Sequence, residues 1–252
     1  AGASVKPGIE ITRTEATRVK MRIETTAMDA LMVRLFDTID EANMAWVIAA
    51  DQALRSAFGA ALIDLVPSYT TLLVHYDCEQ LDHDAACERI NKALAGLSPA
   101  DTQAGELHDI PVWYDESVGP ELPLVAKRAG LNVDELIQQH CNHDYCVFAL
   151  GFAPGYGFMG LVDEALATPR LKTPRRKVAA GSVGIADRQT AIYPLLSPGG
   201  WNILGRTNVP LFEYAKRGAP LFRPGDKVRF RAISREEFEA DGGDTTPMEE
   251  RP

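Results

Sequence analysis

The chain lacks any long apolar run. No stretch approaches the roughly 20 consecutive apolar residues that a membrane-spanning helix needs, and the first residues lack the charged-then-apolar pattern of a secretory signal. We therefore expect a cytoplasmic protein without a membrane partner. With 252 residues, of which 46% are hydrophobic and 24% charged, the composition is that of a soluble globular protein, and the length favours two domains.

Cysteine is scarce. The sequence contains Cys78, Cys87, Cys141 and Cys146. In a cytoplasmic chain of this length we expect reduced thiols and no disulfide framework. Two clusters, His75 to Cys87 and His140 to Cys146, combine residue types that bind zinc, but neither has the paired C-x-x-C spacing of common zinc sites. Buried thiols and surface histidines are the preferred interpretation, and no metal is predicted.

A basic stripe with interleaved aromatic residues is also missing, so no nucleic-acid partner is expected. The net charge is −9, and residues 235–252 supply −5 of it through seven acidic residues and two arginines. This segment also contains Gly242, Gly243 and Pro247. Low hydrophobicity and high charge predict a flexible acidic tail, and residues 1–19 are predicted to form a flexible N-terminal extension.

Residues 20–97 have the pattern of a small α+β domain. Alternating apolar residues from Leu31 to Leu35 indicate a strand, and Thr38 to Glu41 offers a capping box for the helix that follows. Two strands are predicted at 61–66 and 70–76, and then a second helix that ends near Gly96. Residues 98–106, which are polar and contain Pro99 and Gly105, are the predicted linker.

Residues 107–234 have the pattern of a mainly-β domain. Helices are predicted at about 120–129 and 133–141. Strands are predicted at 145–150, 190–194, 201–205 and 227–233. Short strands separated by Gly/Pro turns are typical of a barrel or a sandwich.

Three glycine-containing motifs require interpretation. Gly155 to Gly160 matches G-x-G-x-x-G, but Pro169 would stop the helix that a dinucleotide site needs, and no acidic residue stands where the ribose partner belongs. The turn around Ser182 lacks the G-x-S-x-G spacing of a serine hydrolase. The turn that ends at Trp201 is predicted to present that side chain to the core or to a partner.

A basic segment follows the first motif. It holds Arg170, Lys172, Arg175, Arg176 and Lys177, and Pro169 and Pro174 restrict its backbone. One interpretation is a solvated loop, where most charge runs lie. The other is an anion site, because guanidinium groups bind carboxylates and phosphates through two parallel hydrogen bonds. The residues alone leave both interpretations open.

From about residue 20 onward the chain closely resembles the KipI family, most specifically in its second half. Members of this family include the B-type subunits of 5-oxoprolinase and the first subunits of allophanate hydrolase, and the family is also described as carboxyltransferase domain, subdomain C and D. The motifs that carry this resemblance are Ile110-Pro-Val-Trp-Tyr114, Gly151-Phe-Ala-Pro-Gly155, Thr173-Pro-Arg175, Gly181-Ser-Val-Gly-Ile185, Ile192-Tyr-Pro194, Ser197-Pro-Gly-Gly-Trp201 and Pro224-Gly-Asp226. The resemblance implies an α+β N-terminal domain followed by a mainly-β, cyclophilin-like barrel.

The resemblance also implies partners and cofactors. Family members work with a KipA-like subunit and with a LamB/YcsF-type subunit in ATP-dependent opening of 5-oxoproline. Related halves of urea carboxylase take a carboxyl group from carboxybiotin, so biotin is the expected cofactor for that branch. Another branch inhibits a sensor histidine kinase, which gives the alternative of a regulatory binding protein. Prolyl isomerisation is a third hypothesis that rests on the fold alone.

The substrates and intermediates of this family carry or develop negative charge on oxygen, which a fixed cationic loop can stabilise. The predicted catalytic residues are Arg175, as an anion ligand, and the family-matching His140, as a proton carrier, with a structural histidine as the alternative. The predicted anion-binding residues are Phe152, Pro154, Gly155, Arg170, Arg176, Ser182, Gln189 and Tyr193. The predicted cleft-shaping or partner residues are Ser197, Gly199, Gly200 and Trp201. On this hypothesis Arg175→Ala abolishes turnover by the assembled complex and leaves the fold intact, and the chain alone is inactive.

Overall fold

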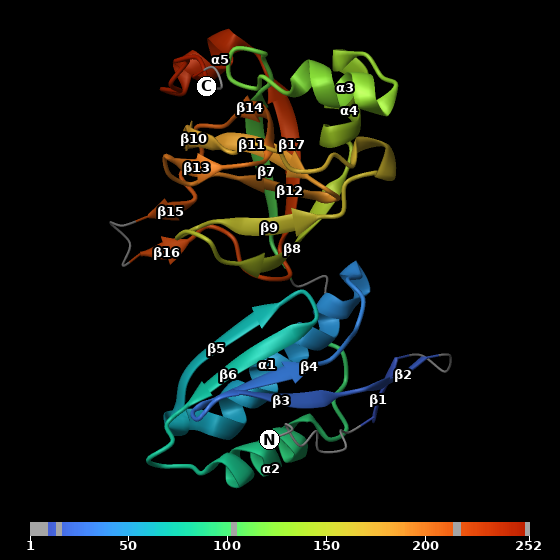
Figure 1. The fold of residues 1–252 in the computed structure, drawn as a ribbon, viewed down its shortest axis with the longest axis vertical. Coiled ribbons are helices and arrows are strands. Elements are labelled where there is room, and N and C mark those ends of the chain that lie inside the picture. The colour runs from blue at the N-terminus through green and yellow to red at the C-terminus, as the bar shows by residue number, and fades with distance from the viewer. Residues whose placement is uncertain (1–9, 14–16, 102–104, 214–217, 250–252) are drawn as a thin grey trace. The chain divides into compact units, whose positions relative to one another are not determined.

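The structure is a computed structural model that describes residues 10–13, 17–101, 105–213 and 218–249. The chain forms two compact units, Ala1–Ala104 and Gly105–Pro252 (Figure 1). The boundary falls within the predicted linker, of which residues 102–104 lie outside the described residues. Each unit is described separately below.

The first unit is built on a four-stranded antiparallel sheet. Its strand order is β3 (Arg22–Ala27), β4 (Ala30–Arg34), β6 (Thr71–Tyr76) and β5 (Leu62–Ser68). Helix α1 (Met44–Phe58) packs against β5, β6 and α2 (His83–Leu94). Along β4 and β6 the buried residues alternate with half-buried ones, because successive strand side chains point to opposite faces of the sheet. One face of the sheet therefore supplies the core of this unit.

Two local predictions for this unit need correction. The predicted N-terminal extension contains an antiparallel hairpin of β1 (Glu10–Arg13) and β2 (Thr17–Lys20), while residues 1–9 and 14–16 lie outside the described residues. The predicted capping box at Thr38 does not form. Instead, Asp40 caps the short 3-10 helix η1 (Glu41–Asn43), which leads directly into α1. A second 3-10 helix, η2 (Gly59–Ala61), follows α1. The sequence placed the helix correctly and its cap two residues too early.

The second unit is a closed seven-stranded barrel. The strands neighbour one another in the order β11, β12, β9, β8, β17, β7 and β14. Their bounds are β7 (Leu107–Trp113), β8 (Asp144–Leu150), β9 (Gly157–Gly160), β11 (Ser182–Ala186), β12 (Gln189–Ile192), β14 (Asn202–Arg206) and β17 (Lys227–Ile233). The described pairings are antiparallel except that between β7 and β17, the green and red strands that run side by side in Figure 1. The predicted fold class, an α+β unit followed by a mainly-β barrel, is confirmed.

Helices α3 (Leu122–Ala129) and α4 (Val133–Cys141) pack against each other, and against β14 and β17 respectively. Both match the predicted helices. Helix α4 begins with a capping box, in which the Asn132 side chain accepts from the Glu135 backbone and the Glu135 carboxylate accepts from the Asn132 backbone. The short 3-10 helix η4 (Glu164–Leu166) follows β9 along the chain.

Two short ribbons complete the unit. Strand β10 (Arg175–Val178) pairs with β13 (Ser197–Gly199), and β15 (Phe212–Glu213) pairs with β16 (Ala219–Pro220). The basic segment therefore runs into β10, and the Ser197 turn forms β13. Sequence motifs separated by about twenty residues are joined here by strand pairing.

The predicted flexible acidic tail is folded where the structure describes it. Helix α5 (Arg235–Ala240) starts at Ser234, whose side chain accepts a hydrogen bond from the Glu237 backbone. Phe238 is 1% exposed and packs in a cluster with Trp113, Val118 and Ile233. The high charge of the segment predicted a solvated tail. The structure instead docks α5 on the barrel unit through the apolar area that the Phe238 ring buries. Residues 250–252 lie outside the described residues.

Among the described residues, none of the helices has the length and apolar character that crossing a bilayer requires. The four cysteines are free. In the same part of the chain, no group of three or more His, Cys, Asp or Glu side chains is arranged to hold a metal ion.

Candidate functional site

Five aromatic rings form a connected cluster beside the β10 and β13 ribbon. This aromatic cluster consists of Phe152, Tyr156, Phe158, Tyr193 and Trp201. Tyr156 is central, because its ring centroid lies 5.1 Å from Phe152, 4.9 Å from Phe158, 5.6 Å from Tyr193 and 6.1 Å from Trp201. The Tyr193 and Trp201 rings are close to perpendicular to Tyr156, at 85° and 83°, and the Phe152 and Phe158 rings are inclined to it at 63° and 61°. Such edge-on arrangements stabilise aromatic contacts beyond the area they bury.

Arg170 places a positive charge over the cluster. Its guanidinium carbon lies 6.0 Å from the centroid of the Trp201 ring, and the residue is exposed. A guanidinium over an indole face is held by cation–π attraction, while its N–H donors remain available to a carboxylate or a phosphate. Of the predicted anion-binding cations, Arg170 therefore has the geometry that the prediction required.

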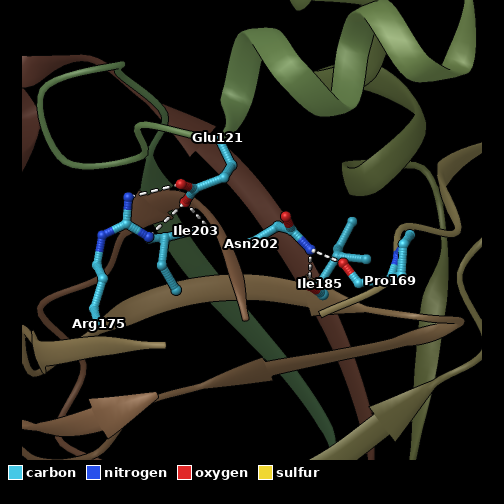
Figure 2. Close-up of polar contacts among 6 residues, drawn as sticks. All are labelled: Glu121, Pro169, Arg175, Ile185, Asn202 and Ile203. Atoms are coloured by element: carbon cyan, nitrogen blue, oxygen red, sulfur yellow. Dashed lines mark hydrogen bonds and ion pairs between the residues drawn. The ribbon is translucent and has the colours of Figure 1, made fainter. Parts of the chain in front are cut away.

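The backbone on both sides of Arg170 is fixed by hydrogen bonds. The Asn202 side-chain amide donates to the carbonyl oxygens of Pro169 at 3.0 Å and Ile185 at 3.1 Å (Figure 2). The Leu171 N–H donates to the Gly200 carbonyl at 2.7 Å. A cation on a fixed backbone loses less conformational entropy when it binds an anion than one on a free loop.

Phe152 is the exposed member of the cluster. Its side chain is 63% exposed, and its φ of 67° lies in the left-handed region, which bulky residues rarely adopt. Its ring contacts Tyr156 and Tyr193 edge-on. A strained backbone that holds an aromatic ring at the surface is a feature of binding sites.

Tyr193 is a buried member of the aromatic cluster and is 1% exposed. Burial raises the pKa of its phenol to about 12, although the Trp201 backbone, Arg170 and Arg175 favour the ionised form. A Cβ atom added at Gly199 would lie 2.2 Å from the phenol oxygen, so only glycine fits against it. Tyr193 is thus a neutral packing residue at pH 7, and the predicted role as an anion ligand does not fit its burial.

The geometry of Arg175 does not favour the predicted role as an anion ligand. Arg175 is 5% exposed, and its two terminal nitrogens donate to the Glu121 carboxylate at 2.9 and 2.6 Å (Figure 2). Glu121 is 1% exposed and also accepts a hydrogen bond from the Ile203 N–H at 3.0 Å. The pair joins β10, β14 and the start of α3. Because both terminal nitrogens of Arg175 already donate to the Glu121 carboxylate, the geometry favours a structural role for this side chain.

The surroundings of His140 favour the structural alternative over the predicted role as a proton carrier. His140 is 0% exposed and stacks on Phe230 at 4.6 Å and 13°. Its Nδ1 lies 2.7 Å from the Tyr114 hydroxyl and its Nε2 lies 3.0 Å from the Thr190 hydroxyl. Burial lowers the pKa of His140 to about 3, so the ring is neutral at pH 7.

The other predicted residues divide between surface and interior. Pro154 and Arg176 are exposed, and Gln189 is half-buried at the start of β12. Gly155, with φ 82°, packs on the Leu211 carbonyl, where a Cβ atom would lie 2.6 Å from the oxygen. Ser182 is buried, and its hydroxyl makes no hydrogen bond with the described residues. Ser197, Gly199, Gly200 and Trp201 lie together on or next to β13, as the sequence suggested.

The G-x-G-x-x-G motif does not form a phosphate loop. Its last four residues are β9, a strand of the barrel, and no helix follows directly. The structure thus confirms the rejection of a dinucleotide site.

Two residues that position the site were not predicted. Glu121 stands between apolar residues immediately before α3, and Asn202 follows Trp201 at the start of β14. An acidic residue inside an apolar stretch signals a buried partner, but the sequence does not say which cation, because Arg175 is 54 positions away.

Comparison with known proteins places this arrangement in a family. The model of the carboxyltransferase domain, subdomain C and D, matches residues 21–222. The B-type subunit of 5-oxoprolinase from Bacillus subtilis (strain 168) is 34% identical over 232 residues, which cover 88% of this chain and 97% of that protein. The chain belongs to the carboxyltransferase-domain family, subdomain C and D, that the KipI resemblance predicted.

Two solved structures share the fold. The crystal structure of TTHA0988 in space group P6522 superposes with a TM-score of 0.72 and 37% sequence identity. That match covers 89% of this chain and 42% of TTHA0988, so the chain spans about two fifths of that protein. The Kluyveromyces lactis urea amidolyase superposes with a TM-score of 0.76 at 16% identity, over 96% of this chain and 16% of that one. The second likeness concerns the fold alone.

Proposed function

We propose that the chain is the B-type subunit of an ATP-dependent, 5-oxoprolinase-like complex that opens cyclic amides. The observation that carries this proposal is the 34% identity to the B-type subunit of a 5-oxoprolinase across 97% of its length. The word subunit in that relative's name implies partner chains. TTHA0988, in which this fold occupies about two fifths of the chain, shows the fold as part of a larger protein.

The geometry supports a role in binding an anionic group. Arg170 faces solvent above Trp201, and Phe152 adds an exposed ring to the same cluster. A carboxylate could accept two hydrogen bonds from Arg170 while an apolar part of the substrate or partner covers Phe152. His140 and Arg175 are buried and paired, so neither takes part in this proposal.

The partners we propose are a KipA-like subunit and a LamB/YcsF-type subunit. ATP belongs to the complex, and no step is assigned to it through this chain. A carboxyltransferase-like reaction with biotin is the variant of the proposal suggested by the family name. In either reaction this chain contributes binding and orientation through Arg170 and the aromatic cluster, and it is inactive alone.

The test is ATP-dependent cleavage of 5-oxoproline by the purified chain, alone and with both partner subunits. We expect turnover only in the complete mixture. Arg170→Ala should lower kcat/KM by about 10- to 100-fold, because a hydrogen bond to a charged group contributes about 1.5–3 kcal/mol. The control Lys92→Ala removes the same charge from an exposed side chain on α2 of the first unit, and it should change kcat/KM by less than about threefold.

The outcomes separate the hypotheses. Full activity of Arg170→Ala in an active complex would remove this residue from the mechanism and leave the family function intact. No turnover in the complete mixture would contradict the oxoprolinase proposal. Inhibition of histidine-kinase autophosphorylation by the chain, measured in parallel, would favour the regulatory alternative.

A further inference from the structure

The C-terminal segment crosses the barrel unit after α5. The Asn208 side-chain amide donates to the Asp241 carbonyl at 2.5 Å. Arg206 is 2% exposed, and its Nη1 donates to the carbonyl oxygens of Asp244 at 2.6 Å and Thr246 at 2.7 Å. A buried guanidinium thus anchors the segment through its backbone, independently of the acidic side chains that dominate its composition.

The end of this segment reaches a small core cluster of the barrel unit that also contains Val178 of β10. The half-buried Met248 packs against the group of buried residues that includes Tyr156 and Trp201. Its N–H donates to the Ser117 carbonyl at 2.7 Å. The next residue, Glu249, forms an ion pair with Lys177 of β10, with 3.2 Å between Oε1 and Nζ.

The part of the tail bound by Arg206 is held more strongly than its end at Met248 and Glu249. The hydrogen bonds of Arg206 are formed by a buried group, which is costly to leave without its partners. The Lys177–Glu249 pair is 59% and 69% exposed, and an exposed ion pair changes an equilibrium by at most about fivefold. Met248 and Glu249 can therefore leave their positions while Arg206 still holds Asp244 and Thr246.

The basic segment that leads into β10 carries more positive charge than the tail neutralises. Arg170, Lys172 and Arg176 are exposed and have no ion pair with the described residues. No acidic residue occurs between positions 165 and 186. The chain as a whole carries a charge of −9, so this segment is opposite in sign to the net charge of the protein.

We propose that the exposed side of β10, centred on Lys177, is a docking site for an acidic segment of a partner polypeptide, and that Met248 and Glu249 occupy part of it in the free chain. The tail shows the chemistry of the partner segment: an apolar side chain packed on the small core cluster that contains Val178, followed by a carboxylate on Lys177. Since both occupants use the same contacts, the partner segment displaces the tail end. This inference does not depend on the reaction that the complex catalyses.

The test uses the full-length chain and a synthetic peptide with the sequence of residues 244–252, Asp-Thr-Thr-Pro-Met-Glu-Glu-Arg-Pro. Binding is followed by NMR chemical-shift changes of the chain at millimolar peptide. The variant Met248→Ser with Glu249→Lys disables the tail end, and it should bind the peptide at least about threefold more tightly than the unmodified chain, because the competing internal segment is gone. Equal affinities, or no binding by either chain, would overturn the proposal.

A charge exchange tests the contact itself. In the disabled-tail variant, Lys177→Glu should lower the affinity for the acidic peptide by about fivefold. A peptide with lysine in place of its first glutamate should bind this Lys177→Glu chain with the affinity restored. Lys92→Glu, the same charge change on exposed α2 of the first unit, is the control and should leave the affinity unchanged. If the acidic and lysine peptides bind the Lys177 chain equally, charge recognition at β10 is refuted.

Discussion

Replacing Arg175 with alanine is expected to destabilise the barrel unit by about 3–5 kcal/mol, because the change leaves the Glu121 carboxylate buried without its cation. Glu121 is 1% exposed, so water cannot replace the two lost hydrogen bonds. An unfolding free energy of about 5–15 kcal/mol is typical of a domain, and a loss of this size removes much of it. Loss of activity in this variant would therefore report unfolding and not catalysis.

The measurement is urea denaturation followed by circular dichroism, with Arg176→Ala as the control. Arg176 is the exposed neighbour of Arg175 on β10, and its replacement should change the free energy of unfolding by less than about 0.5 kcal/mol. The double variant Arg175→Met with Glu121→Gln removes both charges and should recover part of the loss. A folded Arg175→Ala protein with unchanged stability would restore the anion-binding hypothesis for this residue.

Acidification is expected to destabilise the barrel through His140. The folded pKa of about 3 lies below the ordinary value of 6.5, because burial disfavours the charged ring. Between these values the unfolded chain binds a proton that the folded chain does not. The stability contributed by the neutral ring is fully present above pH 6.5, and it is lost by up to about 1.4 kcal/mol for each pH unit as the pH falls toward 3.

This effect can be isolated by comparing the unmodified chain with His140→Gln. We expect the free energy of unfolding of the unmodified chain to fall by about 2–3 kcal/mol more than that of the variant between pH 7 and pH 4.5. His143→Gln removes an exposed histidine three residues further along and serves as the control. Parallel pH profiles for the unmodified chain and His140→Gln would show that His140 is accessible to protons in the folded state.

Local patterns predicted the elements of this fold well. The spacing of apolar residues placed α4 and β17 at their observed bounds, and the motifs identified the barrel through the family resemblance. The turn residues around Trp201 also indicated correctly that this region gathers Gly199, Gly200 and the indole. These features depend on a few neighbouring residues, which is why the sequence reveals them.

Pairings between distant residues could not be predicted in the same way. Arg170 and Arg175 have similar sequence surroundings, yet one faces solvent on an indole and the other is buried on Glu121. Their difference depends on where β10 and the start of α3 meet in the folded unit. The prediction of a flexible tail was wrong for a related reason. The charge of the segment predicts that its side chains are solvated, whereas its position depends on the burial of Phe238 and on the carbonyl groups that Arg206 binds.

The parallel pairing of β7 with β17 has a consequence for biosynthesis. These strands come from the beginning and the end of the second unit, so the ribosome must synthesise the chain past Ile233 before the two strands can pair. Such distant contacts slow folding because a long loop must be ordered first. The first unit, whose strands are all closer in sequence, can mature during translation, while the emerging barrel remains open and exposed to chaperones.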